Sequence, residues 1–197
     1  MIKAIALNDK KELPKIWTRD FILINLSALC LYLSYQMLLT ILPTFISHKG
    51  GGQFTIGLII SLYTIASLFT RPLAGNLIDK IGRKPILFSG LLLFTLCVGS
   101  YYWLATINVI LALRILHGIS WGITSTAIGT AAADLVPKSR YGEGLGYFGL
   151  ASTFGMAFGP NLGIITMNHS LEMSFALASV LGVASLFLLK MISFPVL

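Results

Sequence analysis

Two ionisable side chains lie inside a stretch of mostly apolar residues. Arg114 and His117 are three residues apart, Trp121 follows four residues later, and the next charged residue after Arg114 is Asp134. Residues three apart share one face of a helix, so the two side chains would lie one above the other. A charged group in hydrocarbon costs about 2.5–3.5 kcal/mol on insertion scales, so it usually faces a cavity or a partner. Because imidazole exchanges protons near neutral pH, Arg114 and His117 are candidates for proton coupling. The alternatives are an arginine that snorkels outward as an anchor and a histidine that only packs against a neighbouring helix.

A short charged segment combines glycines with ionic residues at fixed spacing. Gly75 is followed four residues later by Asp79, then by Gly82, Arg83 and Lys84. A glycine at the first position allows another helix to approach closely, and a glycine at the turn permits a tight change of direction. Asp79 could pair with Arg83 or cap the amino end of a neighbouring helix. The alternative is a basic membrane anchor with a tight turn.

A third pattern consists of small residues at helical spacing. Gly155, Gly159 and Gly163 repeat every four residues, Gly146 precedes them, and Pro160 lies among them. The repeat predicts a smooth helix face that another helix can approach closely, with a kink at the proline. Ordinary close packing, without any bearing on function, is the alternative.

The elements that must position these residues are long and apolar. Hydrophobic residues make up 56% of the 197 residues, charged residues 11%, and the mean hydropathy is +0.85, whereas soluble domains carry about 25% charged residues. About 20 residues span the hydrocarbon core, and the runs are too apolar on every face for barrel strands. The sequence predicts an all-α integral membrane bundle over 21–194, after a basic tail at 1–20, with helices at about 21–47, 54–78, 85–105, 107–135, 144–167 and 173–192.

Lysine and arginine gather on one side of the predicted helices. They occur in the tail, in the 79–84 and 136–143 loops and at Lys190, whereas the other side has only Lys49. The excess of basic residues on the cytoplasmic side predicts a multi-pass protein of the cell membrane with both termini in the cytoplasm. This topology explains the net charge of +7, so we expect the lipid bilayer as a partner and no nucleic acid.

Taken together, these motifs resemble those of the major facilitator superfamily. The Gly75–Lys84 segment resembles its signature between helices 2 and 3, and Arg114 followed by Gly118 resembles its helix 4 motif. The Gly146–Gly163 pattern is similar to the antiporter motif of helix 5, although Ile164 replaces the last glycine. The resemblance implies half of the superfamily fold, the amino-terminal six helices, built from two inverted three-helix repeats. It further implies that the Gly75–Lys84 segment latches the outward-facing state and that Arg114 takes part in proton coupling.

The resemblance also implies a function. We expect proton-coupled efflux of small amphipathic or drug-like compounds, with protons and a small-molecule substrate as partners. Substrates of such transporters bind near the bilayer midplane, where the polar and aromatic candidates are Tyr32, Tyr35, Gln36, Tyr63, Thr64 and Trp121. No acidic residue falls in a predicted midspan, so Arg114 is the leading candidate for coupling. The alternatives are a metabolite or sugar facilitator or symporter, and a non-transporting half that assembles with a partner.

Other classes of site find no support in the sequence. It shows no nucleophile–base set and no metal-ligand cluster, so we expect neither an enzyme nor a cofactor. Asp134 and Glu143 are interpreted as ion-pair partners of Lys138 and Arg140. In the superfamily the helix 5 glycine face meets the carboxy-terminal half. Six helices alone would therefore leave that face, and the face at Gly75 and Asp79, without partners. We expect a second six-helix half or a homodimer to cover them.

Overall fold

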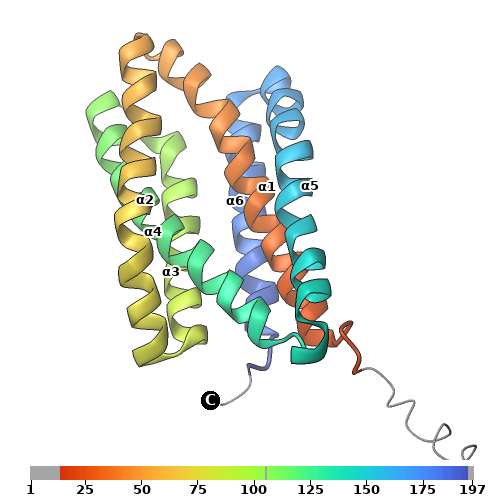
Figure 1. The fold of residues 1–197 in the computed structure, drawn as a ribbon. Coiled ribbons are helices and arrows are strands. Elements are labelled where there is room, and N and C mark those ends of the chain that lie inside the picture. Colours follow the sequence, from red (N-terminus) through yellow and green to blue (C-terminus); the bar gives the residue numbers. More distant parts are fainter. Residues whose placement is uncertain (1–13, 105, 195–197) are drawn as a thin grey trace, which may run out of the picture.

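The computed structural model describes residues 14–104 and 106–194, and within those ranges it is a bundle of helices without strands (Figure 1). The long helices are α1 (Arg19–His48), α2 (Gln53–Ile81), α3 (Arg83–Ser100), α4 (Ile107–Asp134), α5 (Tyr141–His169) and α6 (Leu171–Lys190). Two short 3₁₀ turns, η1 (Tyr101–Trp103) and η2 (Lys138–Arg140), follow α3 and precede α5. All six long helices have the length and composition needed to cross a membrane, which confirms the predicted fold class. Of the predicted tail at 1–20, residues 1–13 lie outside the described residues.

The chain runs up and down through the bundle, and the beginning of α1 and the end of α6 lie at the same end of it (Figure 1). The backbone N–H of Ser193, after α6, donates a hydrogen bond of 3.2 Å to Asp20 Oδ1 in the first turn of α1. We call this end, where α1 begins and α6 finishes, the terminal end, and the other the far end. At the terminal end Gly82 has a φ of +104°, a conformation that side chains other than glycine rarely adopt. This residue lets α2 stop and α3 begin without a longer loop.

The packing of the helices repeats itself between α1–α3 and α4–α6. The α2 helix packs along α4, and α5 packs along α1; likewise α1 contacts α6, and α3 contacts α4. Exchanging α1, α2 and α3 for α4, α5 and α6 therefore turns each main pair into another main pair. The two sets of three also run in opposite directions through the bundle, because α1 rises from the terminal end and α4 descends from the far end (Figure 1). This is the arrangement of two inverted three-helix repeats.

Glycines make the two closest of these crossings possible. A methyl group at Gly118 of α4 would collide with the Tyr63 carbonyl oxygen of α2, and one at Gly122 would lie 2.8 Å from the Ser67 carbonyl oxygen. A methyl group at Gly155 of α5 would lie 2.5 Å from Tyr32 Cβ of α1. In hydrocarbon, where lipid is as apolar as the helices, such close backbone approach is a main source of helix–helix attraction.

The structure corrects one expectation about α5. We expected its glycine face to lack a partner within six helices, but Gly155, Gly159 and Gly163 all pack against α1. Methyl groups at Gly159 and Gly163 would lie 2.5 Å from Gln36 Cβ and 3.3 Å from the Met37 carbonyl oxygen. The glycine face is therefore used inside this domain, because α1 and α5 cross closely. At Gly146, by contrast, an added methyl group would meet no atom of the described residues within 4 Å.

Candidate functional site

Arg114 is buried in the core of the bundle. Its exposed fraction is 2%, and its guanidinium lies over the rings of Tyr63 and Tyr101, 5.2 and 5.1 Å from their centroids. Its Nε has no hydrogen-bond partner, and no ion pair reaches the side chain from the described residues. Two aromatic faces can stabilise a cation by about 2 kcal/mol each when water is excluded. The structure places this side chain away from the surface, so an arginine that snorkels outward is excluded.

His117 lies one helical turn from Arg114 and is fully buried. Its Nδ1 lies 3.0 Å from the Tyr101 hydroxyl, and its Nε2 has no partner among the described residues. Its ring packs against those of Tyr63 and Phe94, with centroids 5.3 and 4.8 Å apart. Tyr101 thus contacts both candidates for proton coupling, by its ring face on Arg114 and by its hydroxyl on His117.

Sequence reasoning missed Tyr101. It precedes the connection between η1 and α4 by a few residues, whereas Arg114 follows that connection by about two turns, so the spacing does not place the two at equal depth. Their contact depends on how α3 and η1 pack against α4, which the sequence pattern does not specify.

Aromatic rings from three helices form the wall of a cavity beside this core. The ring of Tyr35 stacks on Trp121 with centroids 4.1 Å apart, and on Tyr63 at 5.6 Å. Tyr32 meets the edge of Trp121 at 5.6 Å. The cavity has a volume of about 240 Å³ and is lined by Tyr35, Tyr63, Thr64, Ser67, Leu68, Arg71 and Trp121.

The predicted cavity residues are thus brought together only in part. Tyr35, Tyr63, Thr64 and Trp121 line the cavity, whereas Tyr32 stands behind Trp121. Gln36 does not line the cavity. It lies on the face of α1 that packs against Gly159 of α5. The sequence analysis did not select Ser67, Leu68 or Arg71, which also line the cavity. Arg71 could have been noticed, because it is the one charge inside the predicted second helix.

The charged segment at the terminal end forms different pairs from those expected. Arg83 Nε donates to Asp134 Oδ2 at 2.7 Å. Arg83 therefore pairs with Asp134 instead of Asp79, and the predicted pairing of Asp134 with Lys138 was wrong. The bond joins α3 to α4, since Arg83 begins one helix and Asp134 ends the other. Lys84 Nζ donates to the Ile192 carbonyl oxygen at 3.3 Å, which fastens the segment after α6.

Asp79 and Gly75 lie on the surface of α2 at this end. Within residues 14–104 and 106–194, Asp79 makes no hydrogen bond or ion pair. A methyl group at Gly75 would meet no atom within 4 Å. The face of α2 that carries these two residues, one helical turn apart, is therefore not covered by the described part of the chain.

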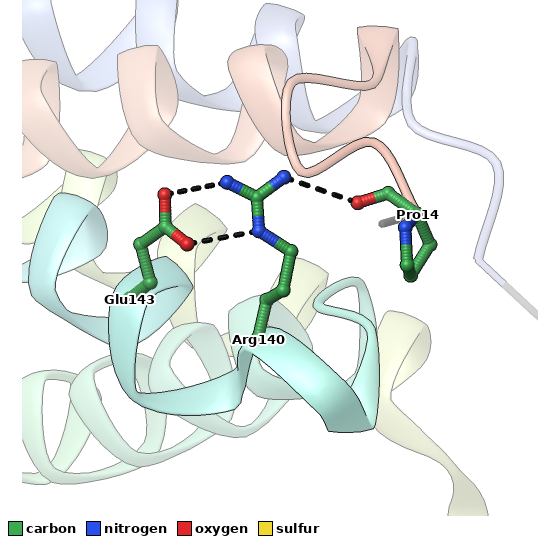
Figure 2. Close-up of polar contacts among 3 residues, drawn as sticks. All are labelled: Pro14, Arg140 and Glu143. Carbon is green, nitrogen blue, oxygen red and sulfur yellow. Dashed lines mark hydrogen bonds and ion pairs between the residues drawn. The ribbon is translucent and has the colours of Figure 1, made fainter. Parts of the chain in front are cut away.

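Arg140 makes the second ionic contact of the terminal end (Figure 2). Its Nε and Nη2 donate to the two carboxylate oxygens of Glu143 at 2.8 and 2.6 Å, which confirms that predicted pair. Its Nη1 donates to the Pro14 carbonyl oxygen at 3.2 Å. The loop before α5 is thereby tied to the segment before α1. Among the described residues, no group of three His, Cys, Asp or Glu side chains could hold a metal ion.

Six membrane-length helices in two inverted sets of three are the arrangement found in one half of many secondary transporters. The sequence model of the Major Facilitator Superfamily matches residues 24–196. The chain belongs to this superfamily.

Individual relatives extend the comparison. The chain is 28% identical over 191 residues to Multidrug resistance protein 2 of Bacillus subtilis (strain 168), an alignment that covers 94% of this chain and 46% of that protein. It is 25% identical over 153 residues to the Quinolone resistance protein NorA of Staphylococcus aureus, covering 78% of this chain and 39% of NorA. The chain thus spans less than half the length of the curated relatives it matches.

Proposed function

We propose that this chain is the amino-terminal half of a proton-coupled exporter of small amphipathic compounds, with both termini in the cytoplasm. The observation that carries the proposal is Arg114, a buried cation that no described anion neutralises. Such a group is expensive in a membrane and is found where ions or substrates pass. The names of the relatives, multidrug and quinolone resistance proteins, favour export over uptake.

The contacts of Arg114 and His117 suggest how the proton is coupled. In the tautomer whose Nδ1–H donates to the Tyr101 hydroxyl, Nε2 of His117 carries the free lone pair and can accept a proton. A second positive charge on His117 would lie one turn from the Arg114 cation in a medium of low dielectric constant, where like charges repel strongly. Protonation therefore favours a state in which Arg114 or a neighbouring helix has moved. A coupling reaction of this kind needs no acidic residue in the midspan.

The terminal end supplies the second element of the proposal. Asp79 lies on an uncovered face of α2, at the end of the bundle that also carries the Arg83–Asp134 ion pair. We propose that this face meets a second six-helix half in the outward-facing state and separates from it when the cavity opens to the cytoplasm. Alternating access by rocking needs such a second bundle, and the relatives are long enough to contain one. A homodimer would satisfy the same requirement.

The test reconstitutes the purified chain in proteoliposomes with an imposed proton gradient and follows a fluorescent amphipathic dye. We expect gradient-driven dye movement that is lost in Arg114→Ala and kept in Arg19→Ala, a matched control at an exposed arginine. Equal transport by both variants would refute the role of Arg114, and movement that ignores the gradient would favour a facilitator. A folded, helical chain that moves no dye would favour a half that functions only with a partner.

A further inference from the structure

Arg71 of α2 has a position that proton coupling does not explain. It lines the aromatic cavity together with Tyr35, Tyr63 and Trp121. Its side chain is exposed and makes no hydrogen bond or ion pair with the described residues.

An anchoring role accounts poorly for this arginine. About 15 Å of helix separates Arg71 from Ile81 at the end of α2, at 1.5 Å per residue. Basic anchors lie at helix ends, where they reach the polar interface, and Lys80, Arg83 and Lys84 already occupy that place. A cation that lies about one-third of the helix length in from the end of a spanning helix needs a polar neighbour or a ligand to offset its desolvation.

The electrostatic surroundings of the cavity are positive. Every acidic residue of the described helices lies in a terminal turn: Asp20, Asp79, Asp134, Glu143 and Glu172. The charged groups next to the cavity are Arg71 in its lining and Arg114, whose guanidinium lies against the Tyr63 ring. A cationic substrate would be repelled by this half, whereas an anionic group would neutralise a charge that now has no partner.

We infer that the cavity binds aromatic compounds that carry a carboxylate, with the ring against Tyr35 and Trp121 and the carboxylate on the Arg71 guanidinium. Guanidinium and carboxylate form two parallel hydrogen bonds, which fix orientation as well as charge. A volume of about 240 Å³ is slightly below that of sites for whole drug-sized ligands. This half therefore holds the ring and the acid group of a larger molecule. The inference rests on the proposed function and names the substrate class of its cavity.

The experiment measures binding rather than transport. The chain has three tryptophans, so replacing Trp17 and Trp103 with phenylalanine leaves Trp121 as the only one. In lipid nanodiscs at neutral pH, quenching of Trp121 is titrated with 4-nitrophenylacetate, 4-nitrophenylacetamide and 4-nitrophenethylamine. The three probes share a ring that quenches tryptophan and differ in the charge of the side group. Free tryptophan corrects for absorption by the probes.

We expect the carboxylate to bind about tenfold more tightly than the amide, as one charge-assisted hydrogen-bond pair would give, and the amine most weakly. Arg71→Gln should abolish the preference, Arg71→Lys should keep part of it, and Arg19→Gln should leave it unchanged. Helical circular dichroism verifies that each variant is folded. The inference is overturned if the carboxylate and amide bind equally, if the amine binds best, if Arg71→Gln keeps the preference, or if no probe quenches Trp121.

Failure of this inference is distinguishable from failure of the proposed function. Carboxylate preference in nanodiscs without gradient-driven dye movement in proteoliposomes would sustain the binding site and reject proton-coupled export by this chain. Dye movement that depends on Arg114, without any preference among the three probes, would do the reverse.

Discussion

The crossing of α2 and α4 gives a sharp test of the packing, through Gly118→Ala. The added methyl group would collide with the Tyr63 carbonyl oxygen and lie 2.9 Å from Ala66 Cβ. Because the first obstacle is a backbone atom, no change of rotamer can clear it. The two helices must separate, and a gap of about 0.5–1 Å forfeits a quarter to a half of the dispersion attraction across a contact.

The expected magnitude follows from two opposing effects. Overpacking of a close contact costs about 1–3 kcal/mol, whereas alanine favours a helix over glycine by about 1 kcal/mol. Gly129→Ala, on the same helix, is the matched control, because a methyl group there meets nothing within 4 Å. It gains the helical preference without the collision. The free energy of unfolding of Gly118→Ala should therefore fall below that of Gly129→Ala by about 1–3 kcal/mol.

The measurement is reversible unfolding of the purified chain in mixed micelles by increasing mole fraction of dodecyl sulfate, followed by circular dichroism. Wild type, Gly118→Ala and Gly129→Ala are titrated under the same conditions. Equal free energies of unfolding for the two variants, or a more stable Gly118→Ala, would refute the close approach of α2 and α4.

Three further predictions use the same unfolding assay. In a double-mutant cycle, Arg83→Gln and Asp134→Asn should show a coupling of only about 0.2–1 kcal/mol, because the side chains are 20% and 28% exposed; a coupling well above that range would contradict the assignment of a screened pair. Tyr101→Phe should lower the free energy of unfolding by about 1–3 kcal/mol, because it leaves the buried His117 Nδ1 unpaired. The control Tyr102→Phe loses only an exposed hydrogen bond to Glu172 and should change that free energy little. Equal effects of the two substitutions would argue against the buried hydrogen bond. Ser185→Ala removes the hydroxyl that hydrogen-bonds to Ser27 of α1 and should lower the free energy of unfolding by about 0.6–1.7 kcal/mol, the range of interhelical hydrogen bonds in membranes. The control Ser179→Ala removes a hydroxyl that bonds only within α6 and should be nearly neutral. A reversed order of the two effects would contradict the α1–α6 contact.

The helices were predictable from the sequence because lipid imposes simple rules. A predominantly apolar run long enough to cross the hydrocarbon must be helical, since its backbone polar groups have no other partner. The six predicted runs correspond to α1 through α6 for this reason. The prediction that Gly82 permits a tight turn rests on an equally local requirement, and its positive φ agrees with it.

Pairings between helices were less predictable, because a residue pattern describes one face and does not name the face opposite. The spacing of Gly155, Gly159 and Gly163 predicted close approach but not that α1 would be the neighbour. Asp134 was assigned to a nearby lysine, whereas the fold brings the Nε of Arg83, at the start of α3, within 2.7 Å of its carboxylate. The partner of His117 was missed for the same reason, since Tyr101 becomes its neighbour only when α3 and α4 lie side by side.

The two glycine crossings also bear on how the repeats could have diverged from a duplicated ancestor. At both crossings the glycines belong to the second repeat, in α4 and in α5, and the atoms they face belong to the first, such as Tyr32 Cβ of α1 and the Tyr63 carbonyl oxygen of α2. The repeats are thus alike in backbone path and unlike in the shapes they present. Two copies of the first repeat would lack the glycines that let the backbones approach at these crossings. The two repeats are therefore complementary at these crossings and not interchangeable, although their backbones follow the same path.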